Sequence, residues 1–63
     1  MSRNRGDEAV IYFQMGRLFL GMDNPTQAQG AYTIALQYGL PSGLDLQARE
    51  ALQIIEKRLE TER

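Results

Sequence analysis

Two short breaks constrain the fold of this chain more than any other feature of its sequence. The first break reads GMDNPT, residues 21–26, and the second reads GLPS, residues 39–42. Each combines a glycine, which suits the position just past a helix, with a proline, which a helix accepts only in its first turn. The breaks leave three segments of helical length. Because such short connections force neighbouring helices to pack antiparallel, the sequence predicts an all-α fold of three helices in up-down-up order.

Local signals place the ends of these helices. Three residues are suited to cap a helix N-terminus: Asp7, Asn24 and Ser42. Pro25 and Gln27 strengthen the signal at Asn24. Residues suited to end a helix are Gly21 and Gly39. The sequence therefore predicts helices over residues 7–20, 25–38 and 42–61. We expect a single domain over residues 1–63, in which residues 1–6 form a flexible tail, 7–39 a helical hairpin and 42–61 a third helix that covers it.

The apolar residues are distributed differently on the first and third predicted helices. At 100° per residue, the third helix carries one apolar stripe, consisting of Leu44, Ala48, Ala51, Leu52, Ile55 and Leu59. Apolar residues of the first helix cover more than half of its circumference; they are Ala9, Ile11, Tyr12, Phe13, Met15, Leu18, Phe19, Leu20 and Met22. A helix of this kind has to be covered from more than one side. We expect part of this surface, drawn from Val10, Ile11, Phe13 and Leu18, to remain uncovered by the other two helices.

Gly16 lies in the middle of the first helix, where a glycine costs about 1 kcal/mol relative to alanine. Its presence indicates that a close contact needs the missing side chain. Seven residues, including this glycine, resemble by their spacing the signature of the tetratricopeptide repeat, W-x2-L-G-x2-Y followed by A-x3-F and a proline. They are Tyr12, Met15, Gly16, Phe19, Ala28, Tyr32 and Ala35, and Pro41 follows one residue later than the family pattern has it.

The resemblance covers residues 8–41, about one repeat, and implies a fold and a binding mode. The hairpin would be an antiparallel tetratricopeptide-like pair whose helices cross closely at Gly16 and Ala28, and the third helix would act as an amphipathic cap. In this family the first helices line a groove for a partner segment, and the matching positions here are Val10, Phe13, Arg17 and Leu20.

Family members that clamp a C-terminal carboxylate use a lysine and an asparagine one helical turn apart. This sequence has Phe13 and Arg17 at those positions. The difference argues against that subtype and favours an apolar ligand face with one guanidinium. Val10 and Phe13 could equally belong to an ordinary core, and the sequence leaves that alternative open.

The composition includes few side chains of the kinds that catalytic and cofactor-binding sites use. The chain has no cysteine and no histidine, and its carboxylates lie mostly at helix ends or along the third helix. We therefore expect no enzymatic activity, no cofactor and no metal site, since Asp7, Glu8 and Asp23 lack the spacing of a metal-binding loop. Seven basic residues against eight acidic ones, with Arg3 and Arg5 in the tail, predict no nucleic-acid partner. No apolar run reaches membrane-spanning length and no signal peptide is recognisable, so we expect a cytoplasmic chain.

A small size raises the question of how the fold is stabilised. A chain of 63 residues buries only about 60% of the surface that its unfolded state exposes, and this one has no disulfide. Stacked repeats normally need about three units. Three interpretations follow: copies associate through the first helix into a homo-oligomer, the chain is the terminal part of a longer repeat array, or another protein completes the stack. The sequence thus predicts a protein-binding adaptor or scaffold, with a purely structural homo-oligomerisation unit as the alternative.

Overall fold

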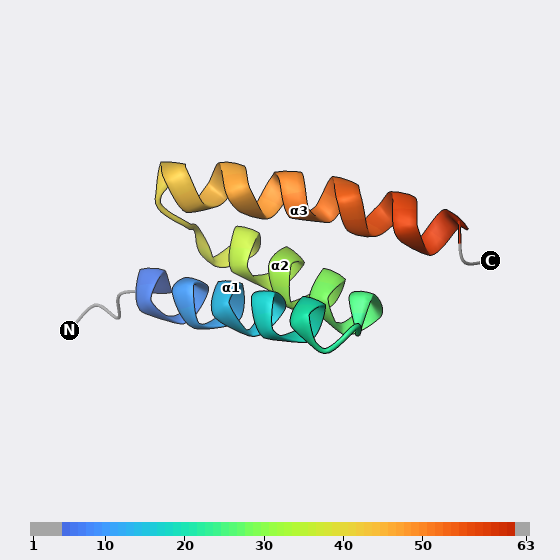
Figure 1. Cartoon of the computed structure of the whole chain (residues 1–63). Coiled ribbons are helices and arrows are strands. Elements are labelled where there is room, and N and C mark those ends of the chain that lie inside the picture. The colour runs from blue at the N-terminus through green and yellow to red at the C-terminus, as the bar shows by residue number, and fades with distance from the viewer. Residues whose placement is uncertain (1–4, 62–63) are drawn as a thin grey trace.

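The computed structural model describes residues 5–61, which form three α-helices and no strands (Figure 1). The helices are α1 (Arg5–Gly21), α2 (Pro25–Tyr38) and α3 (Ser42–Thr61). The predicted all-α class is therefore confirmed. In Figure 1, α1 and α2 run in opposite directions and α3 returns in the direction of α1. Helix α2 packs extensively against both of the others, whereas α1 and α3 contact each other little.

The core is built mainly from small side chains. Five of the eight buried hydrophobic residues in the described part of the chain are alanines; the full set is Ala9, Phe13, Ala28, Ala31, Tyr32, Ala35, Ala48 and Ile55. Small residues let helix backbones approach closely, but each buries little apolar area. The core of the single chain is therefore thin, and among residues 5–61 Ile55 is the one large side chain that is fully buried.

Helix α3 covers α2 with the predicted stripe. Ala48 and Ile55 are buried, and Leu44, Ala51, Leu52 and Leu59 pack against the core while remaining partly exposed. On the outer side of α3, an ion pair between residues four apart joins the Arg49 Nε and Asp45 Oδ1 atoms at 2.6 Å. Arg58 and Glu62 have the same spacing in the sequence, but Glu62 lies outside the described residues.

Helix α1 begins two residues earlier than predicted, at Arg5. Asp7 and Glu8 lie within its first turn, where their negative charge favours the helix N-terminus, so Asp7 is not the N-cap. The predicted tail over residues 1–6 is accordingly wrong for residues 5 and 6, which are helical, and residues 1–4 lie outside the described part of the chain.

The connection between α1 and α2 differs from the prediction in the residue that turns the chain. Asp23, rather than Gly21, adopts the left-handed conformation, with a φ of 61°. The Asn24 N–H donates to the Phe19 carbonyl at 2.8 Å and the Asp23 N–H donates to the Leu20 carbonyl at 3.1 Å. These two hydrogen bonds form a Schellman motif, which ends α1 at Gly21, one residue later than predicted. Aspartate tolerates this backbone conformation better than most residues.

The remaining helix ends follow the sequence signals closely. Asn24 is the N-cap of α2 and Pro25 its first residue, although the Asn24 side chain makes no capping hydrogen bond. Helix α2 ends at Tyr38 as predicted, and Gly39 follows with a φ of 98°, which a glycine adopts without strain. Ser42 was predicted to cap α3 but is its first helical residue.

Candidate interaction surfaces

The residues of the predicted repeat signature centre on one close contact between α1 and α2. Gly16 is buried, and a Cβ atom added to it would lie 2.9 Å from the Cδ2, Cε2 and Cζ atoms of the Tyr32 ring. The same ring packs edge-to-face on Phe13, with 5.6 Å between ring centroids and 73° between ring planes. The close approach predicted from Gly16 is thus present, and its partner is an aromatic ring.

Most other signature residues also lie at this hairpin interface. Ala28 and Ala35 are fully buried, and Phe19 packs against the core while partly exposed. Tyr12 stacks edge-to-face on Tyr38, with centroids 5.6 Å apart. Met15 differs from the expectation, because its side chain is 37% exposed at the edge of the interface with α2.

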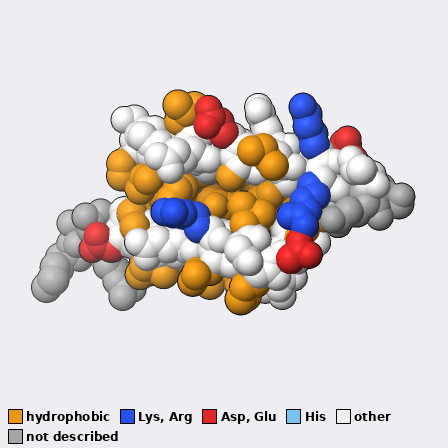
Figure 2. Space-filling model, viewed as in Figure 1, with side chains coloured by type: hydrophobic (Ala, Val, Ile, Leu, Met, Phe, Trp, Pro, Cys, Tyr) orange, Lys and Arg blue, Asp and Glu red, His pale blue; other side chains and the backbone are white. Residues whose placement is uncertain are grey.

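A groove opens between α1 and α3, with α2 as its floor. Its lining residues come from all three helices and are Phe13, Arg17, Tyr32, Gln47, Glu50, Ala51 and Ile54. Figure 2 shows hydrophobic side chains gathered in the recess between α3 and α1. The groove exists because α1 and α3 both pack on α2 but contact each other little. The groove thus has an apolar floor between two walls that carry charges.

The four positions predicted to bind a partner are not equally accessible. Arg17 is exposed at the groove, whereas Val10 and Leu20 are half-buried and Leu20 packs against the core. The expectation that Phe13 presents an accessible side chain is wrong, because the ring is only 4% exposed and packs on Tyr32. Phe13 is therefore mainly a core residue, which is the alternative that the sequence left open. Only a small part of its ring contributes to the groove floor.

The groove carries one charge on each wall. Arg17 on α1 and Glu50 on α3 are exposed, and both line the groove. Burial raises the pKa of the Tyr32 phenol above its ordinary value, while the positive charge of Arg17 acts in the opposite direction. Arg17 thus lies close enough to the groove floor for its charge to affect the pKa of Tyr32.

A second apolar surface lies on the hairpin and involves no residue of α3. It includes an exposed ridge formed by Ile11, Met15 and Leu18 of α1 and by Met22 just after the helix, which are 55%, 37%, 66% and 62% exposed. Beside the ridge is a shallow groove lined by Tyr12, Met15, Phe19, Gln27, Gly30, Ala31 and Ile34. We call the ridge and this groove together the hairpin face.

The sequence predicted only part of the hairpin face. The uncovered surface was expected to be drawn from Val10, Ile11, Phe13 and Leu18; of these four, Ile11 and Leu18 are exposed, Val10 is half-buried and Phe13 is buried. Met15 and Met22 were not among those four, although the 4-3-4 spacing of the ridge residues is that of a helix-packing seam and could have identified them. Gly30 had no explanation from the sequence. In the structure Gly30 lines the groove, and apart from its chain neighbours and the backbone of its own helix no atom lies within 4 Å of where its Cβ would be.

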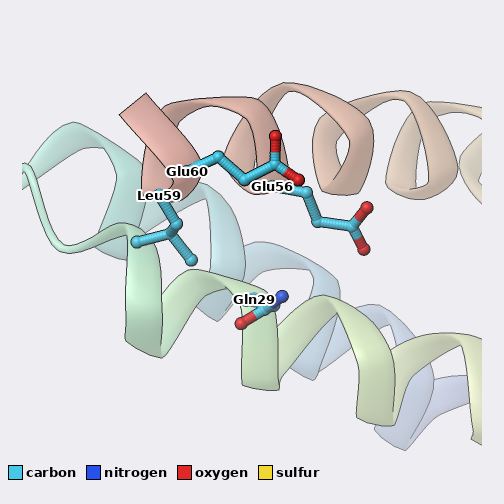
Figure 3. A pocket seen from close by; sticks show the side chains of 4 residues that line it. All are labelled: Gln29, Glu56, Leu59 and Glu60. Carbon is cyan, nitrogen blue, oxygen red and sulfur yellow. The ribbon is translucent and has the colours of Figure 1, made fainter. Parts of the chain in front are cut away.

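A third hollow lies between α2 and the C-terminal half of α3. It is lined by Gln29, Glu56, Leu59 and Glu60, and Figure 3 shows the two carboxylates on α3 with the Gln29 amide across from them. Within residues 5–61, no group of three or more metal-ligating side chains lies close enough together to hold an ion. This hollow therefore lacks the ligand set of a metal site.

The loop between α1 and α2 is tied to the far end of α3. The Arg58 guanidinium forms an ion pair and hydrogen bond with the Asp23 carboxylate, across 35 residues of sequence. Asp23 thus has two structural roles, since it turns the backbone and also pairs with α3.

Comparison of the chain with protein-family models, with curated proteins and with solved structures gives no match. In the described part of the chain, no helix has both the length and the apolar character that a membrane span requires.

Proposed function

We propose that this chain is a protein-interaction module of the tetratricopeptide type, which binds a segment of a partner protein in the groove between α1 and α3. The observation that carries the proposal is the groove itself, with an apolar floor and oppositely charged walls formed by three helices. The seven-residue signature and the contact of Gly16 with Tyr32 support the family assignment.

The lining of the groove suggests the chemistry of the segment that it accepts. Ala51 and Ile54 of α3, with the Tyr32 ring below them, offer apolar contact to one or two aliphatic or aromatic side chains. Arg17 offers a planar guanidinium, which binds a carboxylate through paired hydrogen bonds. We therefore propose a partner segment that places an acidic residue about one helical turn or a few extended residues from an apolar anchor. Binding of this kind needs no catalytic group.

The hairpin face supports a second candidate function. Four exposed apolar side chains form one stripe along α1 and the residue after it, and a contiguous exposed apolar patch of this kind is typical of an interaction surface. A purely structural role, as a homo-oligomerisation unit or as the end of a longer repeat array, would use this ridge and leave the groove empty.

Selection from a library of displayed peptides tests the groove proposal. The purified chain should enrich sequences with an acidic residue near an apolar anchor, and the doubly substituted Arg17→Glu, Ile54→Lys chain should not retain them. Both residues are exposed, so these changes should leave the fold intact. Leu46→Lys is the matched control, because Leu46 is also an exposed apolar residue of α3 but does not line the groove. Peptides that bind both substituted chains as well as the parent would contradict the proposal.

A further inference from the structure

We propose that the hairpin face is a self-association surface, through which two copies of this chain pair about a two-fold axis. The surface is separate from the groove between α1 and α3, so the inference does not depend on what the groove binds. It rests on three features of the hairpin face, which are its lack of charge, its shape and its area.

The hairpin face contains no charged side chain. None of the residues of its ridge or groove is Asp, Glu, Lys or Arg, and between Leu18 and Leu44 the sequence has only Asp23 as a charged residue. Charged residues concentrate instead on α3. The central parts of protein interfaces are depleted of charge. An uncharged face also meets a copy of itself without like-charge repulsion, which makes a second copy a suitable occupant.

The shape of the hairpin face is complementary to itself. Leu18, on α1, and Met22, just after it, belong to a ridge of exposed side chains, and Gly30 leaves open space in the neighbouring groove on α2. In a two-fold pair each contact occurs twice, so the ridge of one copy fills the groove of the other while its own groove is filled in return. This arrangement gives Gly30 a role, because any side chain there would occupy the space that the partner's ridge needs.

The area of the face fits what a specific dimer requires. Four large apolar side chains are between about one third and two thirds exposed in the single chain. With the adjoining groove, two copies would remove on the order of 1,000 Å² or more from water, which is the lower range for specific interfaces. The alanine-rich core buries little apolar surface by itself, so this additional burial is a substantial share of what the fold can gain.

Analytical ultracentrifugation of the full chain over a hundredfold concentration range tests the proposal. We expect a reversible equilibrium between one and two chains. Leu18→Lys should weaken the dimer on the order of 100-fold, because the substitution acts twice in a two-fold pair. Leu46→Lys is the matched control, since Leu46 is 59% exposed and lies on α3 outside the hairpin face. It should leave the equilibrium unchanged. Circular dichroism should show equal helix content in all three chains.

Covalent trapping provides a second and independent measurement, because the chain has no cysteine of its own. A single cysteine at Met15, which belongs to both the ridge and the groove and so lies nearest the two-fold axis, should oxidise to a disulfide-linked dimer much faster than one at Leu46. Equal rates at the two positions would contradict the proposed interface.

A parent chain that stays monomeric at the highest concentration would overturn self-association, and assemblies larger than two would contradict the two-fold pair. If the parent is monomeric but still selects peptides that depend on Arg17, the groove proposal survives alone. If the chain dimerises but selects no such peptide, only the self-association is supported.

Discussion

The ring of Tyr32 fills the space that a side chain at Gly16 would need. Three ring atoms lie 2.9 Å from the place of the missing Cβ, which is closer than real Cβ contacts come. Tyr32 has little freedom to withdraw, since it is 2% exposed and its ring also packs on Phe13. The glycine that disfavours α1 locally is therefore required by the packing of α1 on α2.

This contact predicts opposite effects for two glycine substitutions. Gly16→Ala should lower the free energy of unfolding by about 1–3 kcal/mol, because the methyl group overpacks the Tyr32 ring. Gly30→Ala should raise it by up to about 1 kcal/mol, because alanine favours the helix and meets no neighbour at that position. Urea unfolding of both variants in a Leu18→Lys background measures the free energy of unfolding of the single chain, because that substitution weakens the proposed dimer. Equal effects of the two substitutions would refute the role assigned to Tyr32.

The burial of Tyr32 predicts a loss of stability at alkaline pH. Burial raises the pKa of this phenol in the folded chain, so the unfolded chain, with a tyrosine pKa of about 10, loses the proton first. The contribution is fully present below pH ~10 and is lost as the pH rises through the higher folded pKa. The free energy of unfolding of Tyr32→Phe should therefore decrease less between pH 9 and pH 11 than that of the parent. Parallel curves for the two chains would contradict this.

The free energy of unfolding should depend on which residue replaces Asp23. Asp23→Ala should lower the free energy of unfolding by roughly 1–2 kcal/mol, because alanine disfavours the left-handed backbone and cannot pair with Arg58. Asp23→Asn keeps a residue that tolerates this backbone and removes only the exposed ion pair, so the loss should stay below about 1 kcal/mol. Thermal unfolding of the two variants at low and high salt measures both effects. A larger loss for asparagine than for alanine would contradict the backbone argument.

The sequence predicted the features of the fold that depend on local chemistry. Gly39 ended α2 at Tyr38, and the stripe centred on Ala48 and Ile55 faced the core, because both follow from backbone freedom or from helical periodicity. The start of α1 at Arg5 was missed, because Asn4 and Asp7 are both residue types that suit an N-cap and the sequence alone does not choose between them. The turn at Asp23 was missed because Gly21, the residue type that most readily adopts a left-handed conformation, stands two residues earlier, whereas the two backbone hydrogen bonds that close α1 select Asp23.

The exposure of individual residues on α1 was harder to predict. More than half of its circumference is apolar, so periodicity alone could not tell which side α2 would cover. The structure places Phe13 toward α2 and leaves Leu18 in water, although both are large apolar residues of the same helix. That choice depends on the fit between Gly16 and Tyr32, which sets the rotation of α1 against α2.

The most direct test of the central claim is an NMR titration of the ¹⁵N-labelled chain with a peptide obtained by selection. The account predicts saturable shift changes centred on Arg17, Gln47, Glu50 and Ile54, the accessible walls of the groove between α1 and α3. Shift changes centred on Ile11, Leu18 and Met22, or changes that do not saturate, would contradict binding in that groove.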